Sequence, residues 1–212
     1  MDKPLSFAVP SWGQCLELMD AHAMLPNIRE HSFAVMHVAR FMSEVLTEAG
    51  FNLSLPLVEI GALLHDIGKT ACLDTLNNHA EYGAGILEEL GYPLVAQVVR
   101  EHVHLYEDIV DARHVREAEL VNYADKRVLH DEVVTLQDRF ADLKLRYGRT
   151  PAALARIKAT EIRARDLEEK LFASLAITPS ELLHLNHCRR TSWENCGWPS
   201  LPEGNPRSGK SH

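Results

Sequence analysis

Proline and glycine divide this chain into segments whose apolar residues recur at helical spacing, and this pattern constrains the fold more than any other feature. Several segments begin at a proline: Pro26, Pro56, Pro93 and Pro151. Proline is tolerated in the first turn of a helix because the amide there has no acceptor within the helix. Glycines stand where segments end: Gly50, Gly91 and Gly148. The pattern therefore predicts a succession of helices.

The expected helices cover residues 11–22, 26–50, 56–68, 77–91, 93–102, a segment from Leu120 to Leu129, a continuation to 148, 150–175, and a short last helix from Thr178. No segment alternates between apolar and polar residues as a half-buried strand does. We therefore predict an all-α fold. A helical bundle is expected over residues 1–148, a C-terminal helical extension over 149–187 and an irregular, flexible tail over 188–212.

The charge balance limits the partners of this protein. Its 212 residues include 22 Lys and Arg against 30 Asp and Glu, a net charge of −8 with histidine neutral. We expect neither DNA nor a membrane as a partner. Proteins that bind these anionic surfaces need an excess of Lys and Arg, and this chain has an excess of Asp and Glu. A small phosphorylated substrate stays compatible with this balance, since a metal ion or a lysine can outweigh the net charge locally.

The sequence also indicates a compartment. No apolar stretch approaches the ~20 residues of a membrane-spanning helix. The N-terminal residues lack the pattern of a signal peptide, because Asp2 stands where basic residues are usual and Pro4 interrupts an apolar segment. The cysteines are far apart and form no CxxC: Cys15, Cys72, Cys188 and Cys196. We expect a reduced, cytoplasmic protein.

Histidine and aspartate stand on apolar faces of five predicted helices. The chain has 12 histidines, and a single histidine on such a face is usually a hydrogen-bonded core residue. Several buried histidines together with two carboxylates need a common partner, because an unpaired buried charge is costly. A divalent ion such as Fe, Mn, Zn, Ni, Co or Mg would be that partner. The residues are His31, His65, Asp66, His79, His102 and Asp125.

Part of this set resembles a known signature. His31, the sequence His65-Asp66-Ile67-Gly68 and Asp125 are similar to the H…HD…D motif of the HD superfamily of metal-dependent phosphohydrolases, in its HDIG subgroup. The resemblance covers about residues 12–145. It implies a helical bundle, here an HD-type domain over 1–148, with metal ions bound between helices.

The resemblance also implies roles for these residues. A first ion would be held by His31, His65, Asp66 and Asp125. Asp66 would bridge to a second ion held by the two histidines that match the additional ligands of two-metal members, His79 and His102. The metals implied are Fe, Mn, Ni, Co or Mg. Two alternatives stay open: a single ion, with His79 and His102 on the substrate phosphate, and His104 in place of His102.

Lys69 follows the motif directly. The family often has lysine here, so we expect Lys69 to bind substrate and, with Asp66, to act in catalysis. The alternative is a solvated cation near a helix end. Arg100 and Lys126 are weaker candidates for substrate binding, because single charged residues on helices usually face water.

The function implied is hydrolysis of a phosphomonoester or a nucleotide-type phosphate by a metal-activated water. Cleavage of a phosphodiester or a dinucleoside polyphosphate is an alternative, but no GYP sequence follows the motif, which disfavours cyclic dinucleotides. A di-iron oxygenase on the same ligands is another alternative, and a non-enzymatic HD module for regulation or ligand sensing is a third.

Two further features lie towards the C-terminus. A zinc site would need four residues whose spacing matches no standard arrangement: His184, His187, Cys188 and Cys196. The charge-rich helix after Pro151 is typical of a solvated surface or of a face between subunits, so a homodimer is among the expectations.

Overall fold

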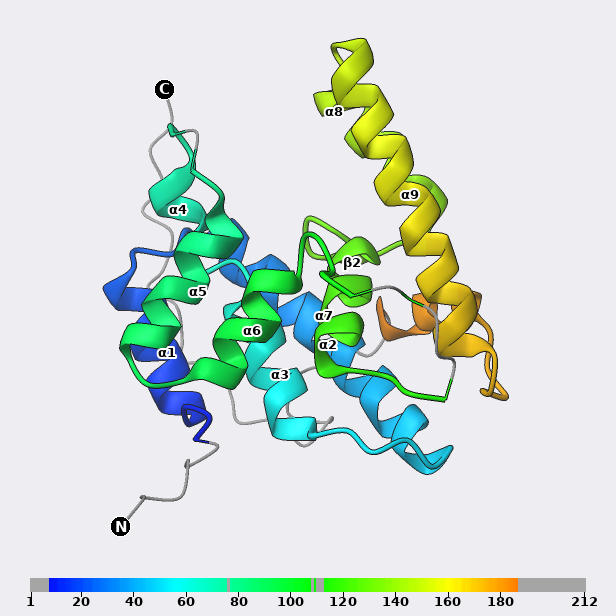
Figure 1. Cartoon of the computed structure of the whole chain (residues 1–212), viewed down its shortest axis with the longest axis horizontal. Helices are drawn as coiled ribbons and strands as arrows, with labels where there is room; N and C mark the ends of the chain where they lie inside the picture. The colour runs from blue at the N-terminus through cyan, green and yellow to red at the C-terminus, as the bar shows by residue number, and fades with distance from the viewer. Residues whose placement is uncertain (1–7, 76, 108, 110–112, 187–212) are drawn as a thin grey trace, which may run out of the picture.

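A computed structural model describes residues 8–186 except 76, 108 and 110–112, and the regular structure in this part of the chain is helical apart from one short hairpin (Figure 1). The all-α prediction is confirmed. The elements are α1 (Trp12–Ala21), α2 (Pro26–Glu48), α3 (Leu55–Leu64), α4 (Lys69–Cys72), α5 (His79–Glu89), α6 (Pro93–Glu101), α7 (Glu117–Lys126), β1 (Val128–Leu129), β2 (Glu132–Val133), α8 (Leu136–Tyr147), α9 (Pro151–Phe172) and the 3-10 helix η1 (Pro179–His184).

The helix ends follow the expected local chemistry. Ser11 and Gln14 form a capping box at the start of α1, and Thr150 accepts a hydrogen bond from the amide of Ala153 at the start of α9. After α2 and α5 the chain turns through the left-handed region at Gly50, with φ of 95°, and at Gly91, with φ of 83°. Sequence and structure therefore agree on most helix boundaries.

Helix α3 lies at the centre of the core. It buries seven of its residues and packs against α2, α6 and α7. Gly61 allows the close approach of α6, because a Cβ at this position would lie 2.5 Å from Cγ1 of Val98. The chain that leaves α3 turns at once, so His65 and Asp66 end up beside the most deeply buried helix.

A short hairpin corrects one prediction. The segment expected to continue as helix to Leu129 ends at Lys126, and Val128 and Leu129 instead pair antiparallel with Val133 and Glu132. The reversal needs a left-handed residue, and His130 provides it with φ of 56°. Histidine is not a strong signal for such a turn, which is why the sequence did not indicate it.

Helices α8 and α9 pair with one another, and Figure 1 shows α8 and the first half of α9 projecting from the bundle. The second half of α9 contacts α7 through a buried ion pair between Lys170 and Glu119, 2.8 Å apart. The division at residue 148 stays a prediction, and the tail expected over 188–212 lies outside the described residues. No helix in the described part of the chain is long and apolar enough to cross a membrane.

Candidate metal centre

The six histidine and aspartate side chains predicted from the sequence meet at one place between the helices. They come from five parts of the chain. His31 lies on α2, His65 and Asp66 follow α3, His79 begins α5, His102 follows α6, and Asp125 lies in the last turn of α7. His65 and Asp66 are 0% and 1% exposed, so this part of the centre lies inside the core, whereas His79 and Asp125 are partly exposed.

One part of the centre joins Asp125 to two histidines. The Oδ1 atom of Asp125 lies 3.0 Å from Nε2 of His31 and 3.8 Å from Nε2 of His65. The nearest donor atoms of these three residues all lie within 4.8 Å of one another, which is close enough for them to hold one ion together.

The carboxylate of Asp66 connects this part to the other two histidines. Its Oδ2 atom lies 3.4 Å from Nε2 of His65. Its Oδ1 atom lies 3.4 Å from Nε2 of His79 and 3.6 Å from Nε2 of His102. The two oxygens of Asp66 therefore face different histidines, and His65, Asp66 and His102 form a second group whose donor atoms could share an ion.

Backbone carbonyls orient three of the imidazole rings. His31 bonds through Nδ1 to the carbonyl of His130 at 2.7 Å, His65 to that of Ala62 at 2.7 Å, and His102 to that of Val99 at 2.6 Å. A carbonyl oxygen only accepts, so Nδ1 carries the proton and, in the neutral ring, Nε2 presents a lone pair to the centre. The bond at Nδ1 leaves Nε2 of each ring facing the centre, where it could bind a metal ion.

Two atoms of the centre lack hydrogen-bond partners among the described residues. They are Nε2 of His65 and Oδ1 of Asp66, both buried. Buried polar atoms are rarely left in this state, because desolvation without a partner costs about 1–3 kcal/mol each. A divalent cation would satisfy a lone pair and a carboxylate oxygen at once, so this donor set fits a metal ion.

The surroundings of the centre favour ionised carboxylates at Asp66 and Asp125 and a neutral ring at His79. Burial raises the pKa of Asp66, but His65, His102 and Lys69 outweigh it and hold that pKa well below the usual range. Burial acts in the same way on Asp125, and there His31, Lys126 and His65 lower the pKa well below its ordinary value. Burial and the neighbouring His102 lower the pKa of His79 to about 4. Metal ligands need these protonation states at neutral pH.

Lys69 contacts the centre from the first position of α4. Its ammonium donates to Oδ2 of Asp66 at 2.5 Å, while its side chain is 39% exposed. Burial lowers the pKa of Lys69, but Asp66 and Asp125 more than offset this effect and raise it overall. Lys69 therefore carries a positive charge between a buried carboxylate and the open space beside it.

That space is a cavity of about 550 Å³. Its lining includes the predicted residues His31, Asp66, Lys69, His79, His102 and Asp125, together with His104, Lys126 and Arg139. His104 lines the cavity, but it is His102 whose Nε2 lies beside Asp66. Arg100 is bound elsewhere, to Glu81 and Glu88.

The sequence did not predict the positions of two basic residues in the cavity lining. Lys126 was expected to face water, yet its side chain is only 8% exposed. Arg139 was not singled out, because it looks like an ordinary surface residue of an amphipathic helix. The tertiary position of α8 brings it into the cavity. The zinc site that the sequence disfavours involves His184, in η1, and three residues that lie outside the described part of the chain, His187, Cys188 and Cys196.

Comparison with known proteins agrees with this geometry. A family model described as HD domain matches residues 28–142, which include all six predicted ligands. An uncharacterized protein of Methanocaldococcus jannaschii is 26% identical over 144 residues, or 62% of this chain and 83% of that protein. No solved structure gives a significant match.

Proposed function

Because this chain belongs to the HD domain family, we propose that it is a metal-dependent phosphohydrolase that cleaves a phosphomonoester or a nucleotide-type phosphate. The observation that carries the proposal is the position of Asp66, whose two oxygens lie between different histidines and beside an open cavity. The sequence His65-Asp66-Ile67-Gly68 supports placing the protein in the HDIG subgroup. Its partner would be a small phosphorylated molecule in the cytoplasm, not DNA or a membrane.

The proposed ligand sets are those that the family resemblance implies, and they overlap only in part with the two groups of neighbouring donor atoms. His31, His65, Asp66 and Asp125 would hold one ion, and Asp66, His79 and His102 a second, with Fe, Mn, Ni, Co or Mg as the metal. Divalent ions supply a nucleophilic water at neutral pH and offset the charge that develops on a phosphoryl group.

Lys69 would bind the substrate, while backbone carbonyls hold the proposed ligand rings in place. Lys69 is placed to donate to a phosphate oxygen, because its ammonium lies at the cavity and is fixed on one side by Asp66. The Nδ1 hydrogen bonds of His31, His65 and His102 keep the ring orientations fixed during turnover.

Phosphate release from nucleotides and sugar phosphates tests the proposal, with purified protein supplied with Mn, Fe, Co, Ni or Mg and its metal content measured in parallel. We expect hydrolysis with at least one metal, its loss in Asp66→Ala, and full activity in Lys158→Ala, which alters an exposed residue of α9. Oxygen consumption by the iron-loaded protein without phosphate release would contradict the proposal in favour of an oxygenase.

A further inference from the structure

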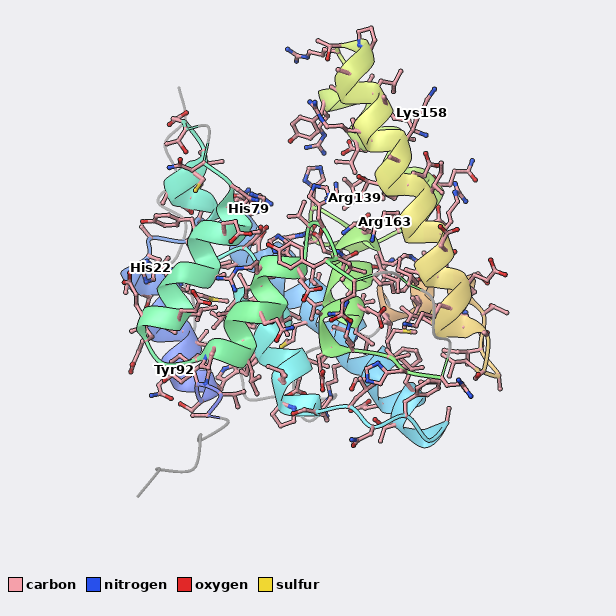
Figure 2. The ribbon with its side chains drawn as sticks, in the orientation of Figure 1. His22, His79, Tyr92, Arg139, Lys158 and Arg163 are labelled. Carbon is pink, nitrogen blue, oxygen red and sulfur yellow. The ribbon has the colours of Figure 1, made fainter. Side chains whose placement is uncertain are left out.

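The cavity beside Asp66 has a basic wall that the proposed hydrolysis does not use. Arg139 on α8 contributes to this wall, with a side chain that is 17% exposed. Its Nε atom is buried and has no hydrogen-bond partner among the described residues. Figure 2 shows His79 beside α5 and Arg139 towards α8 and α9, and both line the same cavity.

The carboxylate nearest to Arg139 is shared. Oδ2 of Asp142 lies 3.8 Å from Nη1 of Arg139, beyond hydrogen-bond distance, while Oδ1 of Asp142 accepts a hydrogen bond from Nε of Arg146 at 2.8 Å. One carboxylate therefore serves two guanidinium groups. Arg139 therefore lines the cavity with at least one donor, Nε, that has no partner among the described residues.

Lys126 adds a second cation to the wall. Its ammonium donates to the carbonyls of His102 and Asn122, each at 3.0 Å, and Oδ2 of Asp125 lies 4.0 Å away. Lys126 and Arg139 both line this cavity, so its wall carries two cationic side chains. Lys126 already has acceptors, whereas Arg139 has no carboxylate oxygen within hydrogen-bond distance among the described residues, so an anionic group in the cavity would give Arg139 a partner.

We propose that Arg139 binds a second anionic group, a carboxylate or a phosphate, on the organic part of the substrate. The preferred substrate is then a phosphate ester that carries another acidic group, and this inference rests on the proposed hydrolysis at Asp66. A guanidinium binds either kind of oxyanion through two parallel hydrogen bonds. Leu129 and Leu143 of the same lining, both partly exposed, would contact the carbon skeleton between the two anionic ends.

A matched pair of substrate series tests this inference. One series is ω-carboxyalkyl phosphates with two to five methylene groups, and the other is the ω-hydroxyalkyl phosphates of the same lengths. Wild-type protein should hydrolyse the best carboxylate ester with a kcat/KM about tenfold to a hundredfold higher than its hydroxyl counterpart, the range for a charge-assisted pair. Arg139→Gln should remove this preference and leave the hydroxyl series within about twofold.

The controls separate a charge effect from a specific contact. Lys158→Gln removes an exposed positive charge from neighbouring α9 and should keep the preference. Arg139→Lys keeps the charge without the fork and should lower the preference only in part. Equal rates for both series in the wild-type protein would overturn the inference without any variant. An equal loss in both series in Arg139→Gln would also overturn it, because Arg139 would then bind the phosphate that is cleaved.

A binding measurement makes the result independent of turnover. Calorimetry on the metal-loaded protein with ω-carboxyalkyl and ω-hydroxyalkyl phosphonates, which cannot be hydrolysed, should show the same preference and its loss in Arg139→Gln. Carboxylate preference in binding, with no hydrolysis of any ester, would refute the proposed hydrolysis and support the second anion site. Hydrolysis with no carboxylate preference in either measurement would support the proposed hydrolysis and refute the second anion site.

Discussion

His31 donates its Nδ1 proton to the backbone carbonyl of His130, 99 residues further along the chain, at 2.7 Å. This bond connects α2 to the turn between β1 and β2 and directs Nε2 of His31 towards Asp125, 3.0 Å away. The sequence did not predict the β1–β2 hairpin. Its backbone nevertheless orients His31, which the sequence did identify as a ligand.

The backbone of His130 provides a first test of this relationship. Its φ of 56° costs a residue with a side chain about 1–2 kcal/mol, a cost that glycine avoids. Both His130→Gly and His130→Val lose the contact of the ring with Arg146. We expect His130→Gly to have the higher free energy of unfolding in urea and to retain metal, and His130→Val to bind metal more weakly. Equal stability of the two variants would contradict a constrained turn.

Metal stoichiometry tests the position of Asp66. If Asp66 is shared by two ions, His79→Ala should lower the metal content from about two ions per chain to one, and Asp66→Ala should remove both. Elemental analysis of the purified variants measures this, with circular dichroism to check folding. His22→Ala is the control, because His22 ends α1 away from the centre (Figure 2). An unchanged ratio in His79→Ala would favour a single ion with His79 on the substrate.

The sequence predicted the parts of this structure that depend on local chemistry. Capping residues such as Ser11 and Thr150 act within one helical turn, so the neighbouring sequence is enough to predict them. The predicted ligands were found because charged and imidazole groups on apolar faces need partners wherever the helices pack. That reasoning required no knowledge of how the helices are arranged.

The features that were missed depend on contacts between distant segments. Arg139 and Lys126 have the appearance of solvated helix residues, and only the packing of α7, α8 and the hairpin places them around a cavity. The strand pair is two residues long on each side, too short for an alternating pattern. Tertiary packing, not propensity, decides these positions.

Cys15 provides a test by pH. Burial raises the pKa of its thiol from 9.0 to about 12, so above pH 9 the thiol ionises in the unfolded chain but not in the folded one. Its contribution to stability should therefore be lost as pH rises, by about 1.4 kcal/mol per pH unit between 9 and 12. Urea unfolding at pH 8 and pH 10 should show a smaller loss of stability in Cys15→Ala than in the wild type. Parallel losses would contradict a buried, protonated thiol.

Glu168 tests how strongly α9 is attached to the end of α7. The guanidinium of Arg127, a residue only 1% exposed, lies 3.2 Å from Oε2 of Glu168 on α9. Glu168→Ala should destabilise the protein by on the order of 2 kcal/mol, less than for a fully buried pair because Glu168 is 23% exposed. Glu169→Ala changes an exposed neighbour and should cost less than about 0.5 kcal/mol. Similar urea midpoints for both variants would contradict the attachment.

Gly68, the last residue of the His65-Asp66-Ile67-Gly68 sequence, packs directly against the backbone of α5. A Cβ at this residue would lie 2.5 Å from the carbonyl oxygen of His79 and 2.7 Å from the amide nitrogen of Gly83. Both are backbone atoms, so they cannot move aside as a flexible side chain would. Gly68→Ala must therefore displace the start of α5, and with it the ring of His79 that lies beside Asp66.

We expect Gly68→Ala to weaken the part of the centre formed by His79 and His102 more than the part formed by His31, His65 and Asp125. The metal content should fall from about two ions to about one, as in His79→Ala, because a displacement near 1 Å is enough to disrupt ligand geometry. Gly85→Ala is the matched control, since a Cβ at Gly85 of the same helix has no atom within 4 Å. Full metal content in Gly68→Ala, measured beside that control, would show that α5 does not depend on this glycine for its position.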